Sequence, residues 1–257
     1  MKIDLIGGAD RIGAMCLFFK TNGKNILADS GNDVPDGLNS RDLVGVPEVN
    51  VREKLRNEHI DLACITHGHN DHVGKIIEVW KDHPTMRVMM TRPTLETARI
   101  ILQDGIRIKY KDQYGRIKEE HREAMNEEIR GVDDLLLGVE VIERPGFYTP
   151  FDRAPIRIGF FPADHIRGAM TVLIKTVENG REKSVLFTGD FGLEDKETVL
   201  AAPIRDEYRG ADLVLCDSTN GSTILPPREE RYRQLVAIVT QTLNRGGNVL
   251  LPCFGVE

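Results

Sequence analysis

The chain has 257 residues, a formal net charge of −6 at pH 7 and a hydrophobic fraction of 40%. Its length lies just above the usual range of one domain, so it fits one large α/β domain or one domain with part of a second. The mildly acidic balance excludes a uniformly basic nucleic-acid-binding surface. It does not exclude a local groove that binds nucleic acid.

No apolar run approaches the length of a membrane span, and the N-terminus has no charged leader before a long apolar stretch. The cysteines stand singly in apolar contexts without a C-x-x-C pair: Cys16, Cys64, Cys216 and Cys253. Such residues are typical of buried free thiols. We therefore expect a cytoplasmic protein in a reducing setting, with no membrane partner.

The N-terminal residues predict three short antiparallel strands. We expect them at residues 2–6, 15–20 and 25–28, with Thr21-Asn22-Gly23-Lys24 as the hairpin turn between the last two. The Gly7-Gly8 pair that follows the first strand opens no helix and lacks the Gly-Lys-Ser/Thr ending of a phosphate-binding loop. It therefore predicts a turn and not a nucleotide site.

Strands and helices then alternate, which is typical of an α/β sandwich. The expected elements are a helix at 51–58, a strand at 60–65, a helix at 73–80, a strand at 87–91 and a helix at 93–103. The segment from about 104 to 138 is highly charged. We expect a solvated helical excursion there.

After residue 151 the pattern returns to strands. They are expected at 156–161, 170–177, 184–188, 213–216 and 248–251. Three of these strands run directly into polar side chains, at His165, Asp190 and Asp217. Because the ends of neighbouring strands share one rim of a sheet, we place the functional site at that rim.

The densest cluster of metal-ligand side chains is Thr66-His67-Gly68-His69-Asn70-Asp71-His72, directly after the predicted strand at 60–65. Imidazole suits zinc, copper, iron and nickel, and a carboxylate adds an oxygen ligand for a second divalent ion or for a bound water. The segment therefore predicts a binuclear hydrolase site. The alternative is an exposed polar turn, or a histidine-rich tract of no function.

Together with Asp29, His165 and Asp190, this loop resembles the four ordered motifs of the metallo-β-lactamase superfamily. Each motif stands in the expected order and at the end of a predicted strand. The resemblance implies an α/β fold, the four-layer αβ/βα sandwich of that superfamily, which we expect to be incomplete at its C-terminal end.

A narrower resemblance is carried by Gly7 to Cys16, by His165-Ile166-Arg167-Gly168-Ala169 and by Asp217-Ser218-Thr219-Asn220-Gly221. These segments are similar to the β-CASP nucleases, the group of ribonuclease J and of the pre-mRNA 3′-end endonuclease. Asp217 occupies the place of that group's first additional acidic motif.

Residues 246–255 look like the segment that leads into the inserted domain of the β-CASP nucleases. We therefore expect residues 1–252 to be the N-terminal portion of a metallo-β-lactamase domain. Residues 253–257 would begin a β-CASP domain that is missing from the chain, which we expect to be a fragment.

The resemblance implies a centre with two metal ions. His67, His69 and His165 would bind one ion, Asp71 and His72 would bind the other, and Asp190 would bridge them. Two ions about 3.5–4 Å apart lower the pKa of a bridging water towards about 7 and clamp the attacking and leaving oxygens of a phosphodiester. Zinc is the expected metal, with manganese as the alternative because two carboxylates supply oxygen ligands.

Three residues are expected to orient the ligands: Asp29, Thr66 and Asp217. Metal-bound imidazole usually donates its other N–H to a carboxylate or a carbonyl. Asp29 precedes Ser30-Gly31, so its alternative role is to cap a turn. Asp71, Asp190 and Asp217 form the expected catalytic group.

The function implied is a metal-dependent phosphodiester hydrolase that processes RNA, as an endoribonuclease or a 5′-exoribonuclease, with water as the nucleophile. We expect RNA rather than DNA as the partner. The sequence does not decide whether the chain forms a homodimer. Lys75, Arg92 and Arg167 are candidate phosphate contacts near the rim, with ordinary surface charge as the alternative.

Two other functions stay open. One is a thioester or lactone hydrolase of the same fold, which the acidic balance favours and the Asp217 segment disfavours. The other is a non-catalytic partner subunit. The intact set of metal ligands argues against this second alternative.

Overall fold

The computed structural model describes residues 1–33, 49–192, 194–195, 198–219, 221–224, 226–252 and 255. The chain divides into two units, Met1–Asp217 and Ser218–Glu257. The domain boundary expected between residues 252 and 253 falls beside Cys253 and Phe254, which lie outside the described residues, as do Val256 and Glu257.

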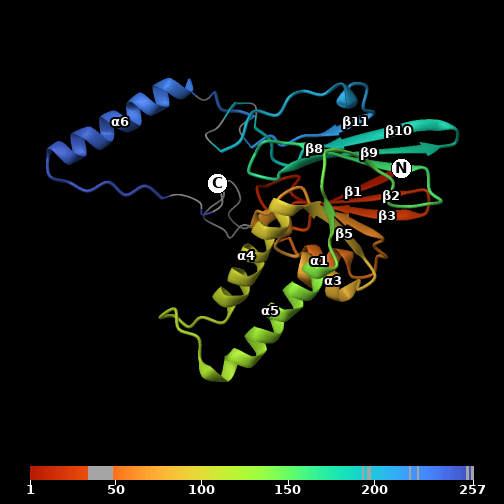
Figure 1. The fold of residues 1–257 in the computed structure, drawn as a ribbon, viewed down its shortest axis with the longest axis horizontal. Coiled ribbons are helices and arrows are strands. Elements are labelled where there is room, and N and C mark those ends of the chain that lie inside the picture. The colour runs from red at the N-terminus through yellow and green to blue at the C-terminus, as the bar shows by residue number, and fades with distance from the viewer. Residues whose placement is uncertain are drawn as a thin grey trace. The chain divides into compact units, whose positions relative to one another are not determined.

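Two β-sheets form the centre of the unit Met1–Asp217 (Figure 1). The first sheet has six strands in sequential order, antiparallel from β1 to β3 and parallel from β3 to β6. Its strands are β1 (Lys2–Gly7), β2 (Cys16–Thr21), β3 (Lys24–Ala28), β4 (Leu62–Cys64), β5 (Arg87–Thr91) and β6 (Glu140–Ile142). Asn22 and Gly23 both have positive φ, as the predicted tight hairpin turn requires.

The second sheet has five strands in the order β11-β10-β9-β8-β7. The strands are β7 (Gly146–Tyr148), β8 (Ile156–Pro162), β9 (Met170–Glu178), β10 (Arg181–Phe187) and β11 (Leu213–Leu215). All neighbours are antiparallel except β10 and β11, which run parallel. The parallel pair brings the segments that follow β10 and β11 to the same edge of the sheet.

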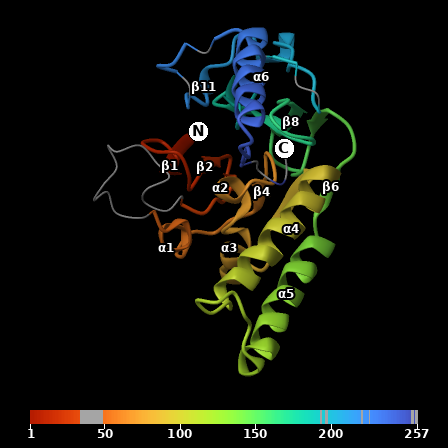
Figure 2. The same cartoon turned by 90° about the vertical axis from the view of Figure 1, so that its left-hand side faces the viewer.

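The helices of this unit lie mainly beside the first sheet (Figures 1 and 2). They are α1 (Val51–Leu55), α2 (Asn70–Val73), α3 (Ile76–Asp82), α4 (Arg92–Lys109) and α5 (Arg122–Leu137), with short 3-10 turns η2 (Glu119–His121) and η3 (Asp206–Tyr208). Thr91 caps the N-terminus of α4, because its Oγ1 accepts a hydrogen bond from the N–H of Thr94.

Two apolar cores lie between the layers, one on each face of the first sheet. Phe18 and Leu27 of the first sheet pack in one core with buried residues of α1, α3, α4 and α5. Phe19 and Ile26, which are their neighbours along the strands, pack in the other core against Ile158 and other residues of the second sheet. Because side chains alternate between the faces of a strand, the first sheet is buried on both sides. The α/β sandwich expected from the sequence is confirmed.

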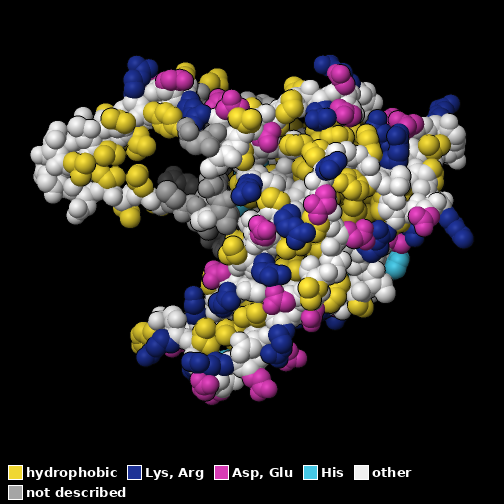
Figure 3. All heavy atoms as spheres, viewed as in Figure 1, with side chains coloured by type: hydrophobic (Ala, Val, Ile, Leu, Met, Phe, Trp, Pro, Cys, Tyr) yellow, Lys and Arg dark blue, Asp and Glu magenta, His cyan; other side chains and the backbone are white. Residues whose placement is uncertain are grey.

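The charged segment at 104–138 differs in part from the expectation. Its second half forms α5, and Val132, Leu135 and Leu136 of that helix are buried in the core beside α4. The spacings of three and four residues between them put these side chains on one face of α5. The prediction that the segment is solvated was therefore wrong for this face. The outer surface of both helices carries mixed Lys, Arg, Asp and Glu side chains (Figure 3).

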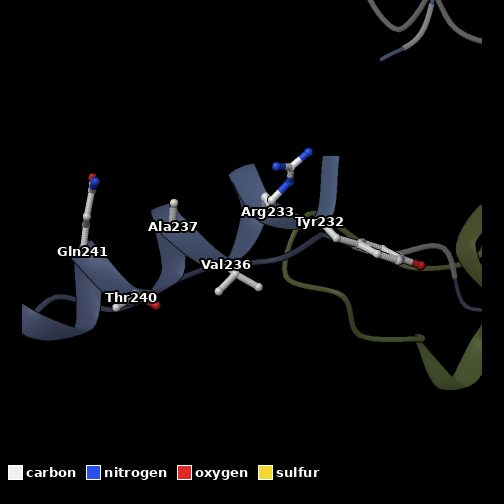
Figure 4. A pocket seen from close by; sticks show the side chains of 6 residues that line it. All are labelled: Tyr232, Arg233, Val236, Ala237, Thr240 and Gln241. Carbon is white, nitrogen blue, oxygen red and sulfur yellow. The ribbon is translucent and has the colours of Figure 1, made fainter. Parts of the chain in front are cut away.

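The unit Ser218–Glu257 contains one helix within its described residues, α6 (Arg228–Asn244). The strand expected at 248–251 was wrong, because these residues have no regular secondary structure and no neighbouring strand pairs with them in the described part of the chain. Figure 4 shows six side chains that line an open hollow along α6, from Tyr232 to Gln241. Among the described residues, no helix is both long enough and apolar enough to cross a membrane.

Candidate metal centre

The predicted site residues come from segments that follow strands of both sheets. The loop after β4 carries His67 and His69, and α2 begins directly afterwards. Asp29 follows β3, His165 lies in the turn between β8 and β9, and Asp190 follows β10. The two sheets therefore contribute to the site from one shared rim.

Among the described residues, four side chains form a cluster that could hold a metal ion: His67, His69, His165 and Asp190. One ligand atom from each lies within 4.8 Å of the others. Nδ1 of His69 lies 3.1 Å from Nε2 of His67 and 3.1 Å from Nε2 of His165. Oδ2 of Asp190 lies 3.5 Å from Nε2 of His165 and 3.9 Å from Nε2 of His67.

This donor set fits a divalent metal ion. Zinc–nitrogen bonds of about 2.0–2.1 Å in a tetrahedron separate the ligand atoms by roughly 3.3 Å. This is close to the 3.1 Å from Nδ1 of His69 to Nε2 of His67 and of His165. Burial, and then the charges of His72, His69 and His165, hold the pKa of His67 well below its ordinary value. His67 is therefore neutral, which is the form of imidazole that binds metals.

His72 lies at the side of this cluster, with a carboxylate at each ring nitrogen. Its Nδ1 is 2.7 Å from Oδ2 of Asp29, and its Nε2 is 3.2 Å from Oδ1 of Asp190. Burial alone lowers the pKa of His72, but the charges and hydrogen bonds of Asp29 and Asp190 raise it well above the ordinary value. The surroundings of Nε2 thus favour a positive charge. Asp71 borders the same nitrogen, with Oδ2 at 3.9 Å.

Asp29 is fully buried below the histidine loop. Its Oδ1 accepts the N–H of Thr66 at 2.7 Å, and its Oδ2 accepts the Thr66 hydroxyl at 2.8 Å. Burial raises the pKa of Asp29 above its ordinary value, although the charge of His72 and the hydrogen bonds from His72 and Thr66 oppose that rise. Asp29 therefore contacts both the start of the loop and the ring of His72.

Asp190 owes its position to the glycine before it. Gly189 has a φ of +56°, and a Cβ built on it would lie 3.0 Å from Cβ of Thr66. The turn after β10 thus packs directly on the start of the histidine loop, which no larger residue would allow without movement. Burial raises the pKa of Asp190, but the hydrogen bond from His72 and the charges of His72, His165 and His69 outweigh burial and lower it.

Asp217 lies two residues after β11 and is not one of the four clustered residues. Its backbone N–H donates to Oγ1 of Thr188 at 3.1 Å, and the same hydroxyl donates to the carbonyl of Gly189 at 2.7 Å. Asp217 therefore contacts the turn that carries Asp190. Of the motif that follows it, Asn220 lies outside the described residues.

Comparison with protein families identifies the superfamily of the chain. The model of the metallo-beta-lactamase superfamily matches residues 9–215. The chain belongs to that superfamily. The recognition made from the sequence is thereby confirmed, and superfamily membership together with the His/Asp cluster indicates a divalent-metal centre.

The curated relatives of this member of the superfamily include proteins named for RNA cleavage and transcription termination. Endoribonuclease ysh1 of Aspergillus fumigatus is 28% identical over 257 residues, which cover 98% of the chain and 27% of that protein. Transcription termination factor FttA of Methanocaldococcus jannaschii is 26% identical over 261 residues, which cover 100% of the chain and 37% of that protein. The chain thus spans well under half the length of these relatives.

Among solved structures, the chain is similar to a protein of unknown function from Enterococcus faecalis V583. The TM-score is 0.50 at 16% sequence identity, with 93% of this chain and 57% of that chain covered. At this identity the likeness concerns the fold alone.

Sequence reasoning missed two residues that support this metallo-β-lactamase site. The hydroxyls of Thr91 and Thr94 both donate to the carbonyl of Gly168, at 2.8 and 3.1 Å, and so fix the turn that carries His165 to the start of α4. A threonine before Arg92-Pro93 is a helix-start signal that predicts the cap. It does not predict that the same hydroxyl reaches residue 168.

Proposed function

We propose that the chain carries the metal-binding portion of a divalent-metal-dependent phosphodiester hydrolase that acts on RNA. The observation that carries the proposal is the position of Asp190, whose two oxygens face different ligands. Oδ2 lies near His67 and His165, and Oδ1 lies near His72. A carboxylate placed in this way suits a bridge between two ions.

These distances support the proposed ligand sets. His67, His69 and His165 would hold one ion, because Nδ1 of His69 lies 3.1 Å from Nε2 of both other histidines. His72 and Asp71 would hold the second ion, and Asp190 would serve both. Zinc is the metal that we propose, since imidazole predominates in the shell, and manganese is the alternative because of the carboxylates.

Two such ions, when bound, would lower the pKa of a water to about 7 and stabilise charge on the attacking and leaving oxygens. The side chains of the protein prepare the site for that chemistry. Asp29 accepts the Nδ1 proton of His72, which leaves Nε2 as the ligand atom. Besides holding the second ion, Asp71 is proposed to orient the attacking water, since its Oδ2 lies 3.9 Å from Nε2 of His72.

Asp217 is proposed to act through the backbone. Its N–H and the Thr188 hydroxyl link the end of β11 to Gly189, the residue before Asp190. This connection supports a positioning role, in which Asp217 holds the bridging carboxylate in place.

The substrate is proposed from the relatives. One of them is named an endoribonuclease and another a transcription termination factor, and both align with almost the whole chain. Because the chain spans well under half of each, we propose RNA as the substrate of the protein that contains this domain. We also propose that residues beyond 252 belong to a further domain of that protein.

The test is hydrolysis of end-labelled single-stranded RNA with zinc or manganese, beside a thioester and a lactone substrate. We expect cleavage of RNA that stops with a chelator and is lost in Asp71→Asn. Asp61→Asn is the matched control, because Asp61 is a carboxylate at the start of β4, where it pairs with Lys24. Hydrolysis of the thioester or lactone without cleavage of RNA would replace the proposal with a small-molecule hydrolase.

A further inference from the structure

The turn between β8 and β9 carries an arginine that is not one of the proposed metal ligands. Arg167 lies two residues after His165 and its side chain is exposed. Other cations near the rim are neutralised, Lys75 by Glu78 at 3.1 Å and Arg92 by Glu143 at 3.7 Å. Within the ranges that the structure describes, Arg167 forms no ion pair.

The backbone around Arg167 is fixed on both sides. Ala163 and Ala169 are joined by a hydrogen bond of 3.0 Å, and the N–H of Met170 donates to the carbonyl of Thr66 at 2.9 Å. On the other side, the carbonyl of Gly168 accepts two threonine hydroxyls from the start of α4. The position of Arg167 is therefore set relative to the histidine loop.

This position suits a second contact with a polynucleotide. Two residues span at most about 7 Å of chain, so the backbone of Arg167 lies within roughly one nucleotide step of the His165 backbone. A substrate whose scissile phosphate lies at the metal centre places its neighbouring phosphate at that range. The planar guanidinium binds phosphate through two parallel hydrogen bonds, which lysine does not provide.

We propose that Arg167 binds the phosphate next to the scissile one and so selects polynucleotides over small diesters. The inference rests on the proposed function. It adds a substrate-contacting residue and a reason why a chain of acidic balance binds RNA at this rim. The overall charge of −6 would otherwise oppose such binding.

The test measures binding and not turnover. Fluorescence anisotropy with a 5′-labelled single-stranded oligoribonucleotide, in chelator so that cleavage does not occur, gives the Kd at several salt concentrations. The variants are Arg167→Ala and Arg167→Lys, with Arg153→Ala as the control. Arg153 is also exposed and, in the described part of the chain, forms no ion pair, but it precedes β8 whereas Arg167 follows it.

We expect Arg167→Ala to reduce the slope of log Kd against log salt by about 0.7 and to weaken binding about fivefold at 0.1 M salt. Arg167→Lys should keep the slope, and Arg153→Ala should match the parent. An unchanged slope in Arg167→Ala, an equal loss in Arg153→Ala, or no binding by the parent would overturn the inference. If the parent cleaves RNA in the hydrolysis assay but Arg167→Ala leaves the salt slope unchanged, only the role of Arg167 is overturned. If Arg167→Ala reduces the slope as expected but the parent does not cleave RNA, only the proposed reaction is overturned.

Discussion

Oδ2 of Asp29 lies 2.7 Å from Nδ1 of His72, and both side chains are buried. The same carboxylate holds the N–H and the hydroxyl of Thr66 at the start of the histidine loop. One residue at the end of β3 therefore sets both the path of the loop and the orientation of a ring within it. Its removal should affect metal binding, although Asp29 is not itself one of the proposed ligands.

Replacement of Asp29 with Asn tests this relationship. Asparagine keeps the shape but loses the charge that supports the ring of His72, so we expect zinc affinity to fall about 10- to 100-fold. Competition with a chromophoric chelator measures the change. Asp61→Asn removes a carboxylate that accepts Lys24 and the N–H of Asn25, away from the site. If Asp61→Asn lowers zinc affinity as much as Asp29→Asn, the special role of Asp29 is wrong.

His165 is one of two proposed ligands, with Asp190, that follow strands of the second sheet. Because His165 is only half-buried, His165→Ala should fold, retain less than two ions per chain and lose hydrolysis. Metal content and circular dichroism of the same sample separate these effects. His121→Ala, at an exposed position before α5, should match the parent. Full metal content in His165→Ala would remove His165 from the proposed shell.

Gly189 tests the packing that places Asp190. Alanine at a positive φ costs about 1 kcal/mol wherever it occurs, and at 189 its Cβ would also press on Thr66. We expect Gly189→Ala to lower the free energy of unfolding by at least about 1 kcal/mol more than Gly180→Ala, in a urea titration. Gly180 has a φ of +73° with nothing within 4 Å of the added carbon. Equal losses in the two variants would show that the contact with Thr66 is unimportant.

Metal removal should lower thermal stability. A ligand at 100 times its Kd stabilises the folded state by about 2.7 kcal/mol, so dialysis against a chelator should lower the Tm by several degrees. His69→Ala, which lacks the nitrogen that faces both His67 and His165, should show a much smaller chelator shift. The prediction fails if parent and variant lose the same number of degrees.

The sequence was sufficient for the elements whose patterns are local. The strand at 87–91 matches β5 to the residue, and Asn22-Gly23 predicts its turn, because these features depend on neighbouring residues alone. The short strands β6 and β7 were not expected. Each has three residues, too few to show a period, and each is held by pairing with a strand that the sequence does not identify as its partner.

The loop from His67 to His72 and the strand ends at His165 and Asp190 were identified from the sequence, and the structure brings them together. What the sequence did not contain is how the turns are anchored. The hydrogen bonds from Thr91 and Thr94 to Gly168 join residues more than 70 positions apart. Such contacts depend on the packing of two sheets and cannot be predicted from spacing along the chain.

The measurement that tests the account most directly is the metal content of the purified chain. After loading with zinc and removal of unbound metal, mass spectrometry of the metal should give two ions per parent chain. Asp71→Asn should give fewer, because Asp71 is proposed to bind the second ion. Well under one ion per parent chain would contradict the proposed centre and, with it, the hydrolase.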